Sequence, residues 1–330
     1  MATSRMNKDE FFRKMAPVDE AGLRKALWTA YWRGTEKTRE LIEESLSPAG
    51  TPVRKAPAKP DPTAVAAEVA EFVTLASEGA YMGRDRRVSR QERSKWRHTF
   101  RRLAKETTDA LAGDNPDPAI GAMESLIDLA CQTTRYQIFH TEDAMEAARF
   151  IVSDAAEALW VAIRRQHGFA AFSAHAARGL WRWESRFGWT LHGWGWVPER
   201  ETSLAQVVAR MLTSADAWGQ LADDYLRLLD DPPRRAFGTE SSRTARNERT
   251  SDLAEWHRLL IEQLMGTDYE DRLDRLVIHP ALSGPELTFL QAQLAVWRGN
   301  QEEARALIQK CRRALPGHSE FKAFAEEIGA

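Results

Sequence analysis

An all-α fold is predicted for this chain of 330 residues. Apolar residues recur every three or four positions through most of the sequence, as on one face of a helix, and no segment alternates like a strand. The periodic segments are short and end at glycine, proline or a capping residue, which is typical of antiparallel helical hairpins. We therefore expect an array of antiparallel helical hairpins that resembles a helical-repeat protein.

The amino-acid composition and net charge limit the kinds of function that this chain can have. Apolar residues make up 43% of the chain, enough for a buried core, and the formal net charge of −2 gives no overall attraction to nucleic acid or anionic lipid. Cys131 and Cys311 lie far apart, which argues against a disulfide framework or a zinc site. With no signal peptide and no apolar run of about 20 residues, we expect a cytoplasmic protein with no membrane span, cofactor or metal.

Two polar stretches divide the chain into five segments. Residues 1–46 form an N-terminal helical hairpin, and residues 47–62, with five prolines in sixteen positions, form a linker. A central all-α domain with a tryptophan-rich core covers 63–230. The charged residues 231–250 form a second linker, and 251–330 form C-terminal hairpins.

Trp28 and Trp32 lie one helical turn apart in the N-terminal hairpin. They are candidates for an aromatic docking surface, although packing against the next domain is the favoured interpretation.

A basic stripe follows a capping box in the central domain. Ser89 and Glu92 have the spacing that begins a helix, and the helix is expected to continue to about Leu111. Five cations recur along one side of it: Arg90, Arg93, Arg97, Arg101 and Lys105. This spacing suits contact with a phosphate backbone, but pairing with acids of neighbouring helices is favoured because the whole chain is nearly neutral.

Three more elements are expected after this helix. One helix runs to about Phe139, a second from Thr141 to Gly168, and a third from Phe169 to Phe187, where Gly188 ends it. The third helix carries an apolar stripe at intervals of three or four residues: Phe169, Phe172, Ala176, Leu180, Trp183 and Phe187.

A glycine-punctuated aromatic loop, Trp189–Trp196, follows the third helix. Five of the twelve tryptophans of the chain fall between Trp181 and Trp196. A short loop of this kind cannot easily bury all its indoles, and tryptophan and arginine dominate interface hot spots. The predicted partner-binding residues are Arg186, Trp189, Trp194 and Trp196.

The C-terminal segment resembles a tetratricopeptide repeat. The matching features are Ala292, the Gly299-Asn300 turn, Glu303-Ala304 and Pro316, at that family's spacing. Residues 251–284 resemble a degenerate earlier copy, with Gly266 set 33 positions before Gly299. Thr288 and Ala295 depart from the family's aromatic positions. The resemblance implies a stack of helical hairpins that binds peptides or partner proteins, and it implies no catalytic residue. No resemblance is identified for residues 1–250.

An enzymatic alternative comes from Arg-x4–6-His spacings, which resemble the motif of all-helical HEPN ribonucleases. Pairs that fit the spacing include Arg93–His98, Arg135–His140, Arg186–His192 and Arg313–His318. Matches of this kind are expected by chance in an arginine-rich chain, and no nucleotide-binding or nucleophile motif is present.

A non-enzymatic scaffold that binds partner proteins through its aromatic-arginine surface and its C-terminal hairpins is therefore favoured. The first alternative is a nucleic-acid-binding accessory subunit that uses the basic helix 90–105, and the second is a helical ribonuclease. The sequence leaves the partner and the oligomeric state open.

Overall fold

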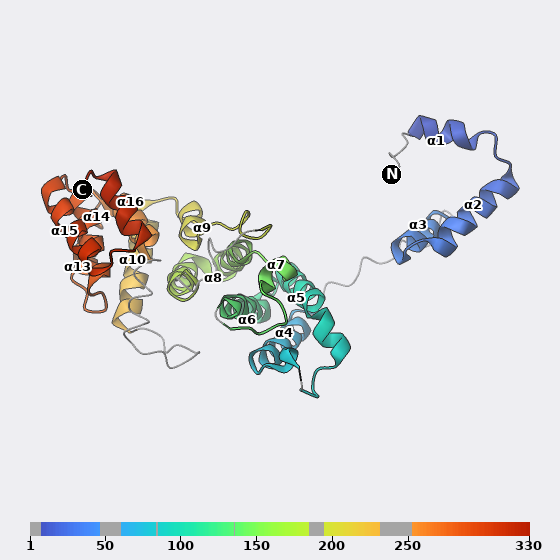
Figure 1. Cartoon of the computed structure of the whole chain (residues 1–330), viewed down its shortest axis with the longest axis horizontal. Coiled ribbons are helices and arrows are strands. Elements are labelled where there is room, and N and C mark those ends of the chain that lie inside the picture. Colours follow the sequence, from blue (N-terminus) through green and yellow to red (C-terminus); the bar gives the residue numbers. More distant parts are fainter. Residues whose placement is uncertain (1–7, 47–60, 84, 135, 185–194, 232–252) are drawn as a thin grey trace. The chain divides into compact units, whose positions relative to one another are not determined.

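The computed structural model describes residues 8–46, 61–83, 85–134, 136–184, 195–231 and 253–330 (Figure 1). Within these ranges the backbone forms helices and turns, and no strand is present, which confirms the predicted all-α class. The chain divides into two compact units, Met1–Ala58 and Lys59–Ala330, here called unit 1 and unit 2. None of the described helices is both long and apolar enough to cross a membrane.

Unit 1 contains α1 (Lys8–Met15), α2 (Glu20–Arg33) and α3 (Glu36–Leu46). The Asp19 carboxylate caps α2 by accepting a hydrogen bond from the Gly22 amide at 2.9 Å. Gly34 forms the turn to α3, where a Cβ atom would lie only 2.4 Å from the Ala30 carbonyl oxygen. No described side chain of this unit is buried, so its helices form a hairpin without a core of their own.

Unit 2 begins with α4 (Pro62–Ser77), the 3-10 turn η1 (Ala80–Met82), α5 (Arg90–Leu111) and α6 (Asp117–Thr133). The predicted capping box is confirmed: the Ser89 hydroxyl accepts from the Glu92 amide, and the Glu92 carboxylate accepts from the Ser89 amide. The predicted apolar stripe of α5 is buried at every position: Trp96, Phe100, Leu103, Thr107 and Leu111. The end predicted for α6, about Phe139, was wrong, because the helix stops at Thr133.

The single helix predicted from Thr141 to Gly168 was also wrong. Asp143, not Thr141, caps the five-residue α7 (Ala144–Ala148). Arg149 then adopts the left-handed conformation, with φ 52°, and ends α7. The chain starts a new helix, α8 (Val152–Trp183), whose first amides are capped from a distance by Glu201. The carboxylate of Glu201 accepts hydrogen bonds from the amides of Val152 at 2.5 Å and Ser153 at 3.0 Å.

A kink divides α8 at Gly168, which has φ 83° and ψ −178°. The predicted helix end at this glycine is therefore confirmed as an interruption between two helical halves. In the second half, the described members of the predicted apolar stripe pack into the core: Phe172, Ala176, Leu180 and Trp183 are buried and Phe169 is half-buried. Phe187 and Gly188 lie outside the described residues.

The remaining helices of unit 2 extend this core or, toward the C-terminus, form a second one. They are α9 (Leu204–Met211), α10 (Ala215–Asp230), α12 (Leu253–Leu264), α13 (Asp271–Val277), α14 (Pro285–Trp297), α15 (Gln301–Ala314) and α16 (Ser319–Glu327). Ser203 caps α9. One cluster of buried apolar side chains extends from Val65 in α4 to Leu294 in α14, and a smaller one joins α14, α15 and α16 around Phe321.

Helices α14 and α15 pack against each other along the chain. Ala292 and Ala304 are fully buried, and Gly299 forms the turn between the helices with φ 77°. The Asn300 side chain caps α15 by accepting from the Glu303 amide at 3.3 Å. Small residues at such positions let two helices approach closely, while the tetratricopeptide arrangement itself stays a prediction.

Candidate functional site beside Trp196

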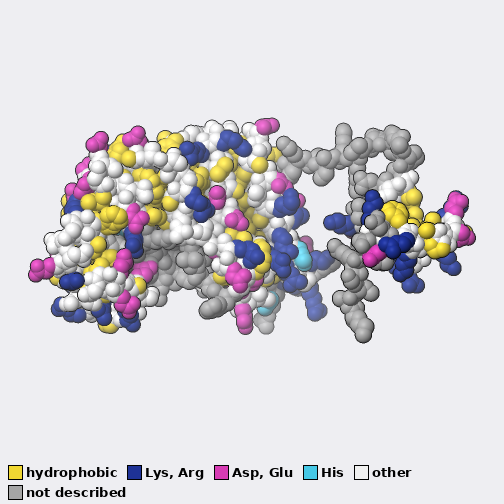
Figure 2. All heavy atoms as spheres, turned by 90° about the horizontal axis from the view of Figure 1, so that it is seen from above, with side chains coloured by type: hydrophobic (Ala, Val, Ile, Leu, Met, Phe, Trp, Pro, Cys, Tyr) yellow, Lys and Arg dark blue, Asp and Glu magenta, His cyan; other side chains and the backbone are white. Residues whose placement is uncertain are grey.

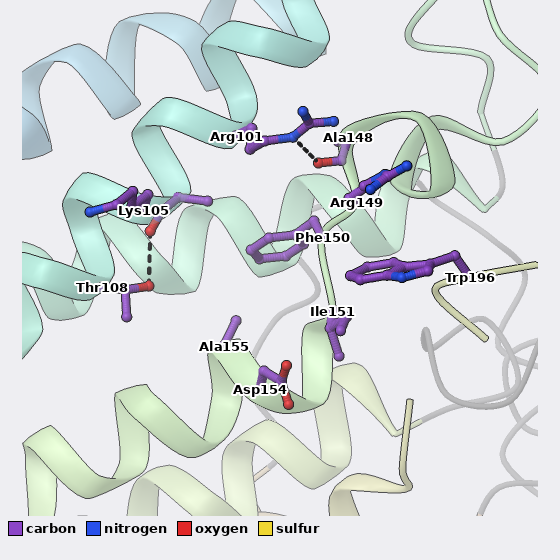
Figure 3. Close-up of a pocket in the computed structure, with 11 residues that line it drawn as sticks. Arg101, Lys105, Thr108, Ala148, Arg149, Phe150, Ile151, Asp154, Ala155 and Trp196 are labelled. Atoms are coloured by element: carbon purple, nitrogen blue, oxygen red, sulfur yellow. Dashed lines mark hydrogen bonds between the residues drawn. The ribbon is translucent and has the colours of Figure 1, made fainter. Parts of the chain in front are cut away.

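A hollow of about 310 Å³ opens where α5, the α7–α8 junction and the segment after residue 194 meet. We call it the Trp196 hollow. It is lined by Arg101, Ala104, Lys105, Thr108, Ala148, Arg149, Phe150, Ile151, Asp154, Ala155 and Trp196. Figure 3 shows Arg101 and Arg149 toward one end of it, Asp154 toward the other, and the rings of Phe150 and Trp196 between them.

Arg101 holds the upper wall of the hollow together. Its Nε donates to the Ala148 carbonyl at 3.1 Å and its second terminal nitrogen donates to the Ala147 carbonyl at 3.2 Å (Figure 3). These carbonyls end α7 and have no partner within the helix. The charge of Arg101 therefore lies at the hollow while part of its hydrogen-bonding capacity serves the fold.

Arg149 and Arg200 lie over the indole of Trp196. Their guanidinium carbons are 5.5 Å and 4.5 Å from the ring centroid, within the range of a cation–π interaction. Arg200 also donates to the Trp196 carbonyl at 3.0 Å. The tryptophan is half-buried, so part of the residue remains accessible to solvent.

Glu146 of α7 anchors the backbone of the same segment. Its two carboxylate oxygens accept from the amides of Trp196 at 3.1 Å and Val197 at 2.8 Å. Gly195, with φ 139°, permits this approach, because a Cβ atom at that position would lie 2.9 Å from a Glu146 oxygen. Trp196 is thus set in a defined position at the mouth of the hollow.

The charge of the lining is predominantly positive. Arg101, Lys105 and Arg149 face one acid, Asp154. The pKa of Asp154 is raised above its ordinary value, first by partial burial and then by the nearby Glu157, while Arg210 lowers it. Lys105 pairs with Asp109 at 2.5 Å, but its side chain stays 75% exposed, so it is free to turn toward a bound anion.

The five cations of the predicted basic stripe differ in their contacts: two donate to backbone carbonyls, one is in an ion pair and two are exposed without a side-chain partner among the described residues. Arg93 donates to the carbonyls of Asp85 and Val88, and Arg101 to those of Ala147 and Ala148. Lys105 is in an ion pair.

Arg90 and Arg97 are exposed, and their side chains make no hydrogen bond or ion pair with any residue that the structure describes. Figure 2 shows basic and acidic side chains mixed over much of the visible face of unit 2, with basic side chains gathered beside a histidine at one end. Part of the basic stripe therefore stabilises the fold, while Arg90 and Arg97 remain exposed at the surface.

Of the predicted partner-binding residues, Trp196 belongs to the hollow, whereas Arg186, Trp189 and Trp194 lie outside the described residues. Arg149, Phe150 and Asp154 of the hollow were not predicted from the sequence. The sequence gives no signal that Arg149 ends a helix. It does so in the left-handed conformation, which is uncommon for any residue except glycine, asparagine or aspartate. The break that brings these residues to the hollow was hidden within an apparently continuous helical pattern.

The arginine–histidine pairs are placed as follows. The Arg93 side chain donates to backbone carbonyls of the loop that precedes α5, while His98 is exposed. His140 contacts the Met82 carbonyl at 2.7 Å, and His318 stacks on Phe321 at 4.2 Å. Arg135, Arg186 and His192 lie outside the described residues. The described members of these pairs thus engage the fold individually, apart from the exposed His98 and Arg313.

Within the described ranges, no group of three or more histidine, cysteine or acidic side chains is placed to hold a metal ion. Neither Cys131 nor Cys311 is in a disulfide. Comparisons of the chain with protein-family models, with curated proteins and with solved structures find no match.

Proposed function

We propose that this protein is a non-enzymatic helical adaptor that binds a partner protein at the Trp196 hollow. The observation that carries the proposal is Trp196 itself, half-buried beneath two guanidinium groups at the mouth of a cationic cavity. Aromatic side chains and arginine are enriched at interface hot spots, where they lie in preformed pockets. The helices behind the hollow supply the rigid support that such a pocket needs.

The lining indicates the chemistry of the partner segment. Phe150 and Trp196 offer apolar rings, and Arg101, Lys105 and Arg149 offer positive charge. A segment with an aliphatic or aromatic anchor next to a carboxylate complements both. The C-terminal helices α14 to α16, with their resemblance to tetratricopeptide repeats, supply a second surface of the kind that binds peptides.

The experiment removes charge from the hollow without disturbing its backbone. Arg149→Asn keeps a residue that tolerates the left-handed conformation, and Lys105→Gln keeps a helix-forming side chain. Proteins co-purified with the full chain from its source cells are quantified by mass spectrometry. We expect partners of the native protein to fall at least about tenfold with the double variant, since each lost charge-assisted hydrogen bond contributes about 1.5 to 3 kcal/mol.

Arg178→Gln is the matched control. Arg178 is an exposed cation of α8 that makes no ion pair or hydrogen bond within the described part of the chain. Thermal unfolding of all variants establishes that the fold is intact. Unchanged partners with the double variant, or equal losses with the control, would reject the hollow as the binding site.

Binding of nucleic acid through α5 is the alternative function. Arg90 and Arg97 are its available cations. Treating the same purifications with nuclease separates the two ideas, because partners held by a shared nucleic acid are lost while partners held by the hollow persist. Each phosphate contact to duplex DNA would also make the slope of log affinity against log salt more negative by about 0.9.

A further inference from the structure

Unit 1 presents an unusual amount of apolar surface. Eleven large hydrophobic side chains are exposed among the described residues, and seven of them fall in residues 8–46. They are Phe11, Phe12, Val18, Leu27, Trp28, Trp32 and Leu46. Trp28 is 59% exposed and Trp32 is 68% exposed, although tryptophan is normally well covered. An apolar concentration of this kind marks an interaction surface.

Trp28 and Trp32 form the centre of this surface, which we call the Trp28 face. They lie one turn apart on α2, and their rings stack at 5.7 Å between centroids with 25° between planes. Tyr31 stacks on Trp28 at 5.8 Å. The rings thus form a continuous aromatic strip along one side of the helix.

Polar contacts join α2 to α3, and none of the described side chains of the two helices is buried. The Tyr31 hydroxyl donates to the Glu43 carboxylate at 2.6 Å, and Arg39 Nε donates to the Tyr31 carbonyl at 3.2 Å. The hairpin is therefore assembled with its large rings still uncovered. Helices of 14 and 11 residues are marginal in water unless an apolar face is packed, so this unit needs a surface to bury against.

The charges of α2 and α3 indicate which surface covers the exposed rings of unit 1. Counting from the sequence, α2 carries Arg24, Lys25 and Arg33 against Glu20, a net charge of +2. Helix α3 carries Lys37 and Arg39 against four glutamates, Glu36, Glu40, Glu43 and Glu44, a net charge of −2. Residues 8–46 as a whole carry eight basic and eight acidic residues, so their net charge is zero.

Opposite and equal charges on the two helices of one hairpin make the hairpin complementary to itself. In a twofold symmetric pair the same patch serves both copies. Helix α2 of each copy then meets α3 of the other, and opposite charges lie together at both contacts. The zero net charge of the segment means that bringing two copies together meets no overall repulsion.

We propose that residues 8–46 are a self-association module. Two copies of the chain pair through the Trp28 face, with α2 of each hairpin beside α3 of the other, and form a four-helix bundle that encloses Trp28 and Trp32. Such a bundle is a regular solution for two amphipathic hairpins. The proposal concerns unit 1 alone and does not depend on the function of the Trp196 hollow.

The first test measures the mass of the full chain by sedimentation equilibrium over a hundredfold range of concentration. The native protein is expected to have the mass of two chains and to dissociate toward one on dilution. Trp28→Gln with Trp32→Gln is expected to leave a single chain at every concentration. Trp297→Gln is the control, because Trp297 is also exposed, at 47%, but lies on α14, and this variant should dimerise as the native chain does.

A native chain that is monomeric throughout would overturn the proposal, and so would a double variant that still dimerises. The first result would mean that another protein or unit 2 covers the Trp28 face. Circular dichroism of the variants establishes that unit 2 keeps its helices, and any loss of helix content is expected to be confined to unit 1, whose short helices are marginal without the pairing.

The second test uses charge exchange. Lys25→Glu with Arg33→Glu changes α2 from +2 to −2, and Glu36→Lys with Glu40→Lys changes α3 from −2 to +2. Both choices leave the contact between Tyr31 and Glu43 in place. Each variant alone places like charges at both helix contacts and is expected to be monomeric. An equimolar mixture restores opposite charges at both contacts and is expected to give a mixed dimer, and failure of the mixture to pair would refute the proposed pairing of α2 with α3.

Discussion

His257 is a titratable residue enclosed in the core of unit 2. It is 2% exposed, and its Nε2 lies 3.1 Å from the Tyr225 hydroxyl. Burial lowers the pKa of the imidazole to about 3, because the charged form would lose its contact with water. The residue is therefore neutral in the folded protein at every ordinary pH.

Acid should destabilise the fold through this residue. Below the unfolded pKa of about 6.5 the unfolded chain binds a proton at His257, whereas the folded chain binds it only near pH 3. The free energy of unfolding is thus expected to fall by about 1.4 kcal/mol per pH unit as the pH drops through this window. His257→Gln should make urea-unfolding stability less dependent on pH.

His98→Gln provides the comparison for the loss of an imidazole as such, because His98 is exposed on α5. Equal slopes for His257→Gln and the native chain would show that the buried imidazole does not limit acid stability.

At the scale of single elements, the first turn of α8 has no capping side chain of its own, and Glu201 caps it from elsewhere in the chain. Ile151 stands at the N-cap position and offers no side-chain acceptor, and the carboxylate of Glu201 replaces it for Val152 and Ser153. Burial raises the pKa of Glu201, and the hydrogen bonds from Ser153 and Val152 oppose this shift. One side chain thereby ties the segment after Trp196 to the helix that forms the lower wall of the hollow.

Glu201→Ala is expected to lower the free energy of unfolding by about 2 to 4 kcal/mol, because two amides at a buried helix end lose their acceptor. Ser214→Ala removes an ordinary cap, on α10, whose hydroxyl accepts from the Ala217 amide at 3.3 Å, and should cost only about 1 kcal/mol. Urea unfolding measures both. Losses of equal size would contradict the special role of Glu201.

The sequence predicted the elements whose signals are local. The capping box at Ser89, the stripe of α5 and the interruption at Gly168 depend on residues within a few turns of one another. The break at Arg149 could not be predicted, because it depends on Glu201, about fifty positions along the chain, and on Arg101 from α5. The hollow combines these distant contributions, and only Trp196 among its described residues stood out for partner binding.

At the scale of the whole molecule, α10 joins the two parts of unit 2. Trp218 stacks with Trp256 of α12 at 6.2 Å, and Tyr225 meets the same indole edge-on at 5.8 Å. Tyr269 donates to Asp216 at 2.6 Å, and Arg272 pairs with Asp223. These contacts connect residues on the two sides of the polar stretch 231–250.

Unit 2 should consequently unfold in one transition. Its helices from α4 to α14 share one apolar core, and separating them at α10 would expose large aromatic surfaces. Differential scanning calorimetry of residues 59–330 is expected to give a single peak whose calorimetric and van't Hoff enthalpies agree. Two resolved peaks would show that residues 63–230 and 251–330 are independent domains.

Gly168 determines how the second half of α8 is rotated about the helix axis relative to the first half. At 100° per residue, the buried faces of residues 152–163 and 172–183 would lie roughly 110° apart around one continuous helix. The positive φ at Gly168 rotates the second half relative to the first, so that both buried faces point into the same core. Since space around its Cα is open, the backbone, and not crowding, requires glycine. A side chain that favoured uninterrupted helix here would turn one of the two faces away from its partners.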